Sequence, residues 1–426
     1  MSQRSVCILG AVFLLVAALV GWKVRHEKSE LRPKLALRDA PDLRSLSRSN
    51  RAEDRHRAKK LKADYDAIFA AVLERNPGLV PKWKSVPDEE NGFLHWLLFL
   101  EKSRGTDGMA SFDFPEDVSE ILSDPEKWNA EIIKAYVEKH ADLLEELTRI
   151  GLLTGQSTYG ISPDRWSFME ANIAKQSAEI LCADARLAAE SGDGDRALLR
   201  IKAVIGLSNH QGLVETPTLI AATVAILVKL TALEESMNHV LPALDLKQED
   251  YAQWRQVLSP DPMMKFTDFL RGEGYGGMRG LVIPVVSNNT DFSEKDHIPD
   301  PDALYDAITQ GYLHAMKRAE STSYLDHWQH HVGERWFTET PENLSDQSVE
   351  IYHTLNMGWD VYSKGWARAV ALFRRYDAAF AILEGREPPM EVLTGKPFVY
   401  DSQTRVLDFP DEEILEGIKA DELKLP

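Results

Sequence analysis

The chain is poor in cysteine, which limits its redox chemistry and the ways it can be cross-linked. Only Cys7 and Cys182 occur in 426 residues, so the sequence holds no disulfide framework and no Cys-x-x-Cys pair. Cys182 lies in the helical pattern "AEILCADARLAAE". An isolated cysteine in such a pattern behaves as a small buried apolar residue rather than as a nucleophile.

Signatures of the common nucleotide-binding and hydrolytic sites are also missing. There is no G-x-S-x-G nucleophile elbow and no G-x-x-x-x-G-K-[ST] phosphate loop. "GEGYGG" at 272–277 meets the G-x-G-x-x-G spacing, but it follows the helical "MKFTDFLR" and precedes the apolar "LVIPVV" instead of joining a strand to a helix. We therefore predict a flexible loop. Glu273 is the one catalytic candidate, because a Glu among glycines often lies where backbone and ligand approach closely.

Positive charge is scarce outside the first 62 residues. Residues 1–62 contain 15 Lys and Arg against 6 Asp and Glu, a net charge of +9, which leaves −27 for residues 63–426. An acidic body repels phosphate backbones, so we expect no nucleic-acid partner. The basic arm is either a solvated, extended linker or a segment that contacts anionic lipid headgroups.

One long apolar run is present, at the amino terminus. Residues 6–22, "VCILGAVFLLVAALVGW", are 17 uncharged residues, enough for a short membrane-spanning helix. No small-x-small cleavage site follows, so residues 1–22 are predicted to be an uncleaved signal anchor and 23–62 a basic flexible tether. Basic residues after the segment favour a cytoplasmic body, but large domains translocate largely regardless of charge. We expect a single-pass inner-membrane protein with its soluble domain in the periplasm.

The body is dominated by helical periodicity. Residues 63–385 are predicted to form one helical domain, with a boundary or functional loop near 271–300, and 386–426 a small module. "SGDGD" at 191–195 joins two helices in a hairpin, with Asp193 or Asp195 as the cap of the second. A long apolar stripe predicts one helix over 125–151, and further helices are predicted from Asp302 to Phe337 and from Gln347 to Leu383. Thr216 is the predicted cap of a central buried helix. Short β-type runs occur at 398–400 and 405–407.

The predicted fold class is therefore mainly α, an irregular helical bundle of α–α hairpins with a small carboxy-terminal β-hairpin.

Histidines gather in one passage, "SYLDHWQHHVGERWF" at 323–337. On a continuous helix His327, His331 and Glu334 share one face, opposite an apolar stripe. Zinc needs a third and usually a fourth ligand, and His-Glu-x-x-His is absent because Trp328 follows His327. We therefore expect a solvated polar face and no metal, with these three residues as the metal candidates. A further ligand would have to come from His297, His314 or His353.

Several motifs resemble those of a known group of bacterial proteins. They are "VPDEENG", "ARLAAESGDGDRAL", "HQGLVETPTLIAATVA" and "RRYDAAFAILEGREPP" leading to "LTGKPFVYD". Together they resemble uncharacterised signal-anchored helical proteins of planctomycete and verrucomicrobial type, with one tetratricopeptide-like hairpin and a pseudopilin-like carboxy-terminal module. The resemblance implies an exported, envelope-facing helical protein and transfers no catalytic residue. The chain lacks the methylated Phe-Thr-Leu-x-Glu helix of pseudopilins, which argues against filament assembly.

Three functions follow from these observations. The first is a membrane-tethered helical scaffold that binds another protein or peptide in the cell envelope, without catalysis and without a cofactor. The second is a metal-dependent or carboxylate-based hydrolase that uses Glu273 and the carboxy-terminal histidines. The third is an accessory component of a secretion or pilus-like system.

Overall fold

The computed structural model describes most of the chain beyond the predicted tether. The described residues are 63–64, 66–103, 112, 114–161, 171–259, 265–276, 300–329, 336–337, 340–355, 359–410, 418 and 422–426. In these stretches we find no helix that combines the length and the hydropathy needed to cross a bilayer. The predicted anchor and tether lie outside the described residues.

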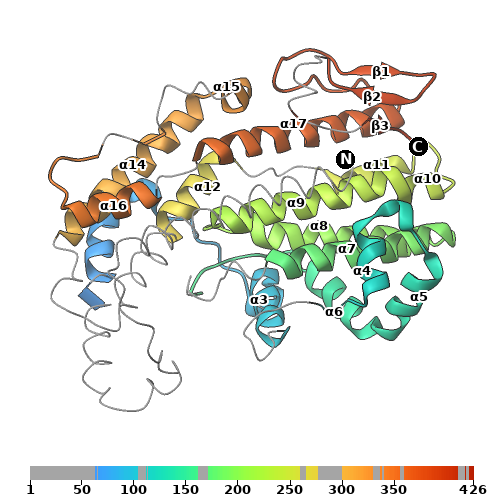
Figure 1. The fold of residues 1–426 in the computed structure, drawn as a ribbon, viewed down its shortest axis with the longest axis horizontal. Helices are drawn as coiled ribbons and strands as arrows, with labels where there is room; N and C mark the ends of the chain where they lie inside the picture. The colour runs from blue at the N-terminus through green and yellow to red at the C-terminus, as the bar shows by residue number, and fades with distance from the viewer. Residues whose placement is uncertain are drawn as a thin grey trace, which may run out of the picture.

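The protein is mainly helical, as its periodicity predicts, with one small sheet at its carboxy-terminal end (Figure 1). The helices of the amino-terminal half are α3 Gly92–Ser103, α4 Glu116–Ser123, α5 Ala130–Lys139, α6 Ala141–Gly151, α7 Ala171–Glu190 and α8 Gly194–Gly212. Those that follow are α9 Leu219–Glu235, α10 Leu241–Ala243, α11 Tyr251–Leu258, α12 Phe266–Gly272, α14 Pro301–Ser321, α15 Tyr324–Gln329, α16 Asp346–Leu355 and α17 Trp359–Leu383. One-turn segments are η1 Pro77–Leu79, η2 Asp88–Glu90, η3 Pro125–Lys127 and the π-helical η6 Ser236–Val240.

The predicted hairpin is present as α7 and α8. Gly192 has φ +80°, a left-handed conformation that glycine adopts without the steric cost of a Cβ. Asp193 then caps α8, because its carboxylate accepts a hydrogen bond from the backbone N–H of Arg196 at 3.0 Å. Both parts of the prediction are confirmed, and the cap is Asp193 rather than Asp195.

Helices α6 and α8 cross at glycines. A Cβ placed on Gly206 would lie 1.7 Å from the carbonyl oxygen of Gly151, and one on Gly151 would lie 2.2 Å from the carbonyl oxygen of Ala203. The two backbones therefore meet directly, with no side chain between them. Next to this contact, Nε2 of the buried His210 lies 2.9 Å from the carbonyl oxygen of Ile150, which ties α8 to the end of α6.

Two predictions for the amino-terminal half are wrong in detail. The helix expected over 125–151 is divided into η3, α5 and α6, and His140 between α5 and α6 has φ −113° and ψ 28°. The cap of α9 is Thr218, whose Oγ1 accepts from Ala221 N–H at 3.2 Å. Thr216 instead lies buried with its hydroxyl 3.0 Å from that of Thr158. The spacing of apolar residues indicates which face of a helix is buried. It does not indicate where a helix begins or breaks, because those points depend on tertiary contacts.

Helix α9 lies at the centre of the bundle, as predicted. It packs against α7 and α8 on one side and against α17 on another (Figure 1). The helix is apolar on nearly all sides and is interrupted by Lys229, which is buried with its Nζ 5.9 Å from the ring centroid of Phe373. An apolar helix surrounded by others is the usual centre of a helical core.

Helices occupy both of the carboxy-terminal stretches in which they are predicted. In 302–337 the described helices are α14, which ends at Ser321, and α15, which begins at Tyr324. In 347–383 they are α16 and α17. Residues 277–299 and 330–335 lie outside the described residues, and with them most of the boundary expected near 271–300.

The sheet is a three-stranded antiparallel ribbon, β1 Val399–Asp401, β2 Val406–Asp408 and β3 Leu423–Lys424. The first two strands are the predicted hairpin displaced by one residue, with Val399 opposite Asp408. The two-residue β3 gives no sequence pattern and was not predicted. Leu407 on β2 and Leu423 on β3 belong to the same hydrophobic core as the helices.

Candidate functional site

Glu273, the catalytic candidate from the sequence, serves as a helix cap. It lies at the carboxyl end of α12, and its Oε2 accepts a hydrogen bond of 2.8 Å from the backbone N–H of Leu219, the first residue of α9. Burial raises the pKa of Glu273, and the bond from Leu219 opposes this rise. A carboxylate at a helix amino terminus satisfies an otherwise unpaired N–H and complements the helix dipole. These interactions give Glu273 a structural role.

His327 is not on a solvated face, and that expectation is wrong. Only 1% of the residue is exposed. Its Nδ1 lies 2.6 Å from Ser363 Oγ on α17, and its ring stacks on that of Trp336 at 5.3 Å between centroids. The helical-wheel argument fails because α15 is only six residues long and turns His327 toward α17 and Phe266 of α12, while Tyr324, Asp326 and Gln329 form its exposed side. Burial lowers the pKa of His327 to about 4.

The other metal candidates, His331 and Glu334, lie outside the described residues. Within the described stretches, no three His, Cys, Asp or Glu side chains converge as a metal site would require. His353 contacts the hydroxyl of Thr340 through Nε2 at 3.1 Å. Glu273 and His327 have different hydrogen-bond partners, Leu219 and Ser363 respectively.

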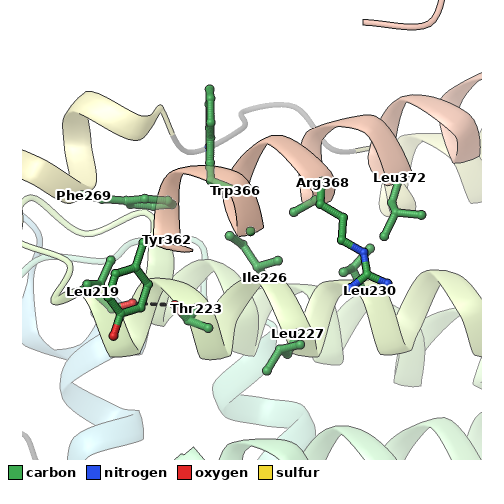
Figure 2. A pocket seen from close by; sticks show the side chains of 12 residues that line it. Leu219, Thr223, Ile226, Leu227, Leu230, Phe269, Tyr362, Trp366, Arg368 and Leu372 are labelled. Atoms are coloured by element: carbon green, nitrogen blue, oxygen red, sulfur yellow. Dashed lines mark hydrogen bonds between the residues drawn. The ribbon is translucent and has the colours of Figure 1, made fainter. Parts of the chain in front are cut away.

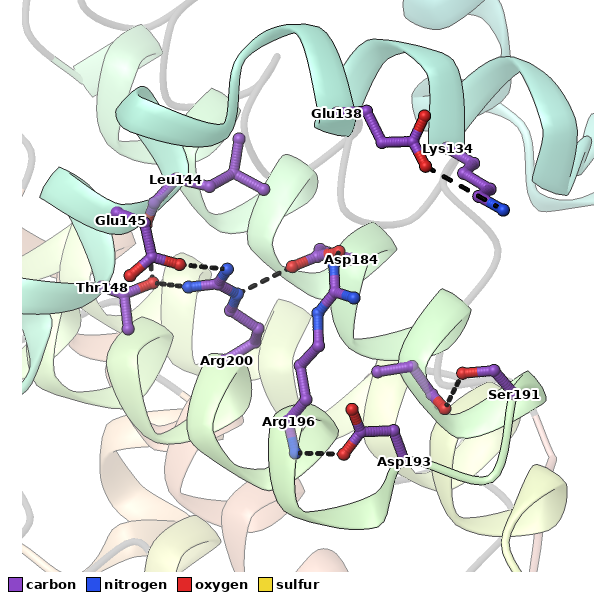
Figure 3. Close-up of polar contacts among 11 residues, drawn as sticks. Lys134, Glu138, Leu144, Glu145, Thr148, Asp184, Ser191, Asp193, Arg196 and Arg200 are labelled. Carbon is purple, nitrogen blue, oxygen red and sulfur yellow. Dashed lines mark hydrogen bonds and ion pairs between the residues drawn. The ribbon is translucent and has the colours of Figure 1, made fainter.

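A buried ion-pair network joins α6, α7 and α8 (Figure 3). Arg200 on α8 donates from Nε to Asp184 on α7 at 2.7 Å, and from Nη2 to Glu145 on α6 at 2.9 Å. Arg196 also pairs with Asp184, whose side chain is fully buried. Every charge in the network has a partner, so we assign it to the packing of three helices and not to a binding site.

A polar pocket lies between α4, η3, α7 and the end of α9, and we call it the acidic pocket. The space between its walls is about 840 Å³ with the open solvent at its mouth included. Its apolar wall includes Ile121, Leu122, Pro125 and Trp128. Its ionisable side chains are Lys175, Glu179, Arg186, Glu234, Glu235 and His239.

Among the described residues, some of the charged side chains in the acidic pocket are paired with an opposite charge, and one is not. Glu179 is paired with Lys175 at 3.3 Å, and Arg186 is held by Glu190 at 3.0 Å and lies over the Trp128 ring at 4.0 Å. Glu235 has no hydrogen bond or ion pair among the described residues. Burial raises its pKa to about 7, against the opposing charge of Arg186.

Cys182 lies at the base of the acidic pocket and is 2% exposed, as predicted for a small apolar residue. Burial raises the pKa of its thiol well above the usual value, and the charges of Glu235 and Glu179 raise it further. Both carboxylates therefore lie near the same sulfur atom, although they belong to different helices. A thiol in this state is protonated and unreactive.

The second hollow is an apolar groove between α9 and α17, with α12 at one end, and we call it the α9–α17 groove (Figure 2). The space between its walls is about 450 Å³ with open solvent included, so it is a shallow groove rather than a closed cavity. Its wall is mostly hydrocarbon, from Leu219, Ile226 and Leu230 on α9, Phe269 on α12, and Trp366 and Leu372 on α17. Among the lining residues that the structure describes, Arg368 is the one charged residue, and its guanidinium extends from α17 toward Leu230 on α9 (Figure 2).

Comparison of the chain with protein-family models, with curated protein sequences and with solved structures finds no match. The two hollows are therefore interpreted from their own chemistry. The acidic pocket had a sequence signal that our prediction did not use. Glu179, Cys182 and Arg186 follow one another at spacings of three and four residues, which places them on one face of a helix. Nothing local in the sequence brings Glu235 to that face.

Proposed function

We propose that this chain is a membrane-tethered helical binding protein of the cell envelope, and that its acidic pocket receives a cationic side chain of a partner protein or peptide. The observation that carries the proposal is the Glu235 carboxylate, which lines the pocket without a hydrogen-bond partner among the described residues. An open, acid-lined hollow with an apolar wall matches a Lys or Arg side chain, whose aliphatic stem packs on hydrocarbon while its charge meets a carboxylate.

The overall charge supports a basic partner. The body carries a net charge of −27, and such a field increases the encounter rate of cationic ligands while disfavouring anionic ones. Within the pocket, Glu179 and Arg186 already have partners of their own. Glu235 is the carboxylate that gains most from an incoming cation.

Binding of a cation also has a defined pH dependence. The pKa of Glu235 is near 7 when the pocket is empty, so that about half of its carboxylate is protonated at neutral pH. A bound ammonium or guanidinium group favours the charged form and lowers this pKa. Affinity for the cation should therefore rise as the pH is raised from 6 to 8.

The test is a calorimetric titration of the full chain with two short peptides. One is acetyl-Ala-Leu-Lys-Leu-Ala-amide, and the other has norleucine in place of lysine, which keeps the stem and removes the charge. We expect the lysine peptide to bind on the order of tenfold more tightly, as a charge-assisted hydrogen bond predicts. Glu235→Gln should abolish this preference.

A matched control is Glu138→Gln on α5. Glu138 forms an exposed ion pair with Lys134 at 3.9 Å. Its substitution by Gln removes the same formal charge from the protein as Glu235→Gln does. The control should keep the wild-type preference for lysine. Equal binding of both peptides by the wild type, or equal loss in both variants, would reject the pocket as the site.

A second function, acid–base catalysis, is favoured by one observation. A carboxylate with a pKa near 7 in a cleft is suited to act as a general acid at neutral pH. If the chain is a hydrolase, Glu235 with Glu179 is a better pair than Glu273 with the histidines, because both line one pocket. Release of nitrophenol from a panel of nitrophenyl esters and glycosides, lost in Glu235→Gln but kept in Glu138→Gln, would support this function over binding alone.

A further inference from the structure

The α9–α17 groove contains a cation that the described protein leaves unpaired. Nε and Nη2 of Arg368 are buried, and neither has a hydrogen-bond partner among the described residues. No carboxylate opposes the effect of burial, which lowers the pKa of Arg368 to about 10. A guanidinium stays protonated at this pKa, so the groove holds a permanent positive charge at neutral pH.

An unpaired buried guanidinium is unusual, because removing it from water without a compensating anion is unfavourable. The other buried arginine described above, Arg200, has partners on two neighbouring helices. Arg368 instead points from α17 across the groove toward hydrocarbon on α9 (Figure 2). The groove around Arg368 is therefore suited to an anionic ligand.

The shape and lining of the rest of the groove indicate the kind of molecule that would carry the anionic group. From Leu219 to Leu230 the α9 side of the groove is about 16 Å long at the rise of an α-helix, and its lining is almost entirely apolar. Phe269 and Tyr362 lie toward one end and Arg368 and Leu372 toward the other (Figure 2). This is a hydrocarbon track with a single positive charge near one end.

We propose that the α9–α17 groove binds a single-chain fatty carboxylate, with its carboxylate on Arg368 and its alkyl chain along α9 toward Phe269. A carboxylate is favoured over a phosphate because Arg368 is the one cation among the described lining residues, and it balances a single negative charge. The planar guanidinium donates two parallel N–H groups that match the two oxygens of a carboxylate.

This ligand is independent of the acidic pocket, which is lined by other residues of α7 and α9. The two proposals can therefore fail separately. A chain bound in the groove would add contacts to both α9 and α17, which already pack against each other, and would stabilise the folded protein increasingly as the ligand concentration rises.

The test is photo-crosslinking of the full chain, held in membrane vesicles. The probe is dodecanoic acid that carries a photoreactive diazirine at its methyl end. After photolysis, labelled peptides are mapped and quantified. The same label on dodecanol supplies a probe without the carboxylate. We expect labelling by the acid to fall within 219–230 on α9 or around Phe269 on α12, and to exceed labelling by the alcohol on the order of tenfold.

Arg368→Met keeps the length of the side chain and removes its charge. In this variant labelling by the acid should fall to the level of the alcohol, while labelling by the alcohol is unchanged. Arg374→Met, on the same helix, replaces an arginine that already pairs with Asp377 at 3.2 Å and should label as the wild type does. Because Nε and Nη2 of Arg368 have no hydrogen-bond partner to lose among the described residues, its variant should melt at or above the wild-type temperature, which keeps the comparison valid.

Three results would overturn the proposal. Equal labelling of the wild type by acid and alcohol would show that the charge of Arg368 is not used. Labels confined to peptides outside α9, α12 and α17 would place the fatty acid elsewhere. Stronger competition by dodecyl phosphate than by unlabelled dodecanoate would assign the groove to a phosphate headgroup instead of a carboxylate.

Discussion

Adding a single methyl group where α6 and α8 cross should strongly destabilise the protein. In Gly206→Ala the new Cβ would lie 1.7 Å from the carbonyl oxygen of Gly151. Non-bonded carbon and oxygen atoms rest near 3.5 Å, so the helices must separate by about 1.5 to 2 Å. Both atoms in conflict are attached to helical backbone, and no rotamer change can relieve the overlap.

The expected loss of stability can be estimated from opposing terms. Alanine in a helix interior is favoured over glycine by about 1 kcal/mol. Overpacking a close contact typically costs about 1 to 3 kcal/mol of stability. A gap of about 1 Å along the rest of the interface also removes roughly a quarter to a half of the dispersion energy of each contact. Separation also stretches the contact of His210 with the Ile150 carbonyl, 2.9 Å in the native protein. We expect a net loss of about 2 to 3 kcal/mol.

The assay is urea unfolding followed by far-ultraviolet circular dichroism, with the midpoint compared at constant slope. The control is Gly194→Ala at the start of the same helix, where the nearest atom to a new Cβ is a Leu244 methyl at 3.6 Å. This variant should be as stable as the wild type or up to about 1 kcal/mol more stable. A Gly206→Ala protein that matches Gly194→Ala would refute the direct backbone contact.

Three further predictions concern buried polar groups. Asp184→Asn leaves Arg200 without its charged partner on α7 and should lower the free energy of unfolding by about 3 to 5 kcal/mol, measured by urea unfolding; an effect under about 1 kcal/mol would contradict the buried pair. His210 has its pKa lowered to about 4 by burial, so the unfolded chain takes up a proton first as the pH falls below 6.5. The stabilisation of the wild type over His210→Gln should therefore be complete above pH 6.5 and shrink toward pH 4, by at most about 3 kcal/mol; a difference that is constant or grows on acidification would refute this. Cys182 should resist iodoacetamide in the native protein and react after unfolding in urea, as mass spectrometry of the intact chain will show; rapid native alkylation would place the thiol at the surface.

Periodicity was sufficient to predict the helical class, the α7–α8 hairpin with its Asp193 cap, and the central position of α9. These features depend on local spacing and on capping chemistry, which are fully present in the sequence. The division at His140 and the separation of α14 from α15 were not predicted. An apolar stripe continues through such breaks, because the residues on both sides are buried against the same core.

The candidate sites were less accessible to sequence reasoning. A helical wheel over 323–337 predicts a polar face for His327 because it assumes one continuous helix, whereas α15 ends at Gln329 and exposes Tyr324, Asp326 and Gln329 instead of His327. Glu273 was singled out for its glycine neighbours, whereas its role depends on Leu219, 54 residues away. Glu235 and Arg368 lie in ordinary helical patterns, and the sequence does not show that both lack a hydrogen-bond partner in the described part of the chain, because that depends on where the neighbouring helices lie.

The measurement that most directly tests the proposed binding function is the pKa of Glu235 in the presence and absence of a cationic ligand. Glutamate carboxyl carbons labelled with ¹³C, with Glu235→Gln to assign the resonance, report this pKa by nuclear magnetic resonance. We predict a value near 7 for the free protein and a fall of about one unit or more when the lysine peptide is added at saturation, with no change for the norleucine peptide. A Glu235 pKa that is the same with either peptide would contradict the account.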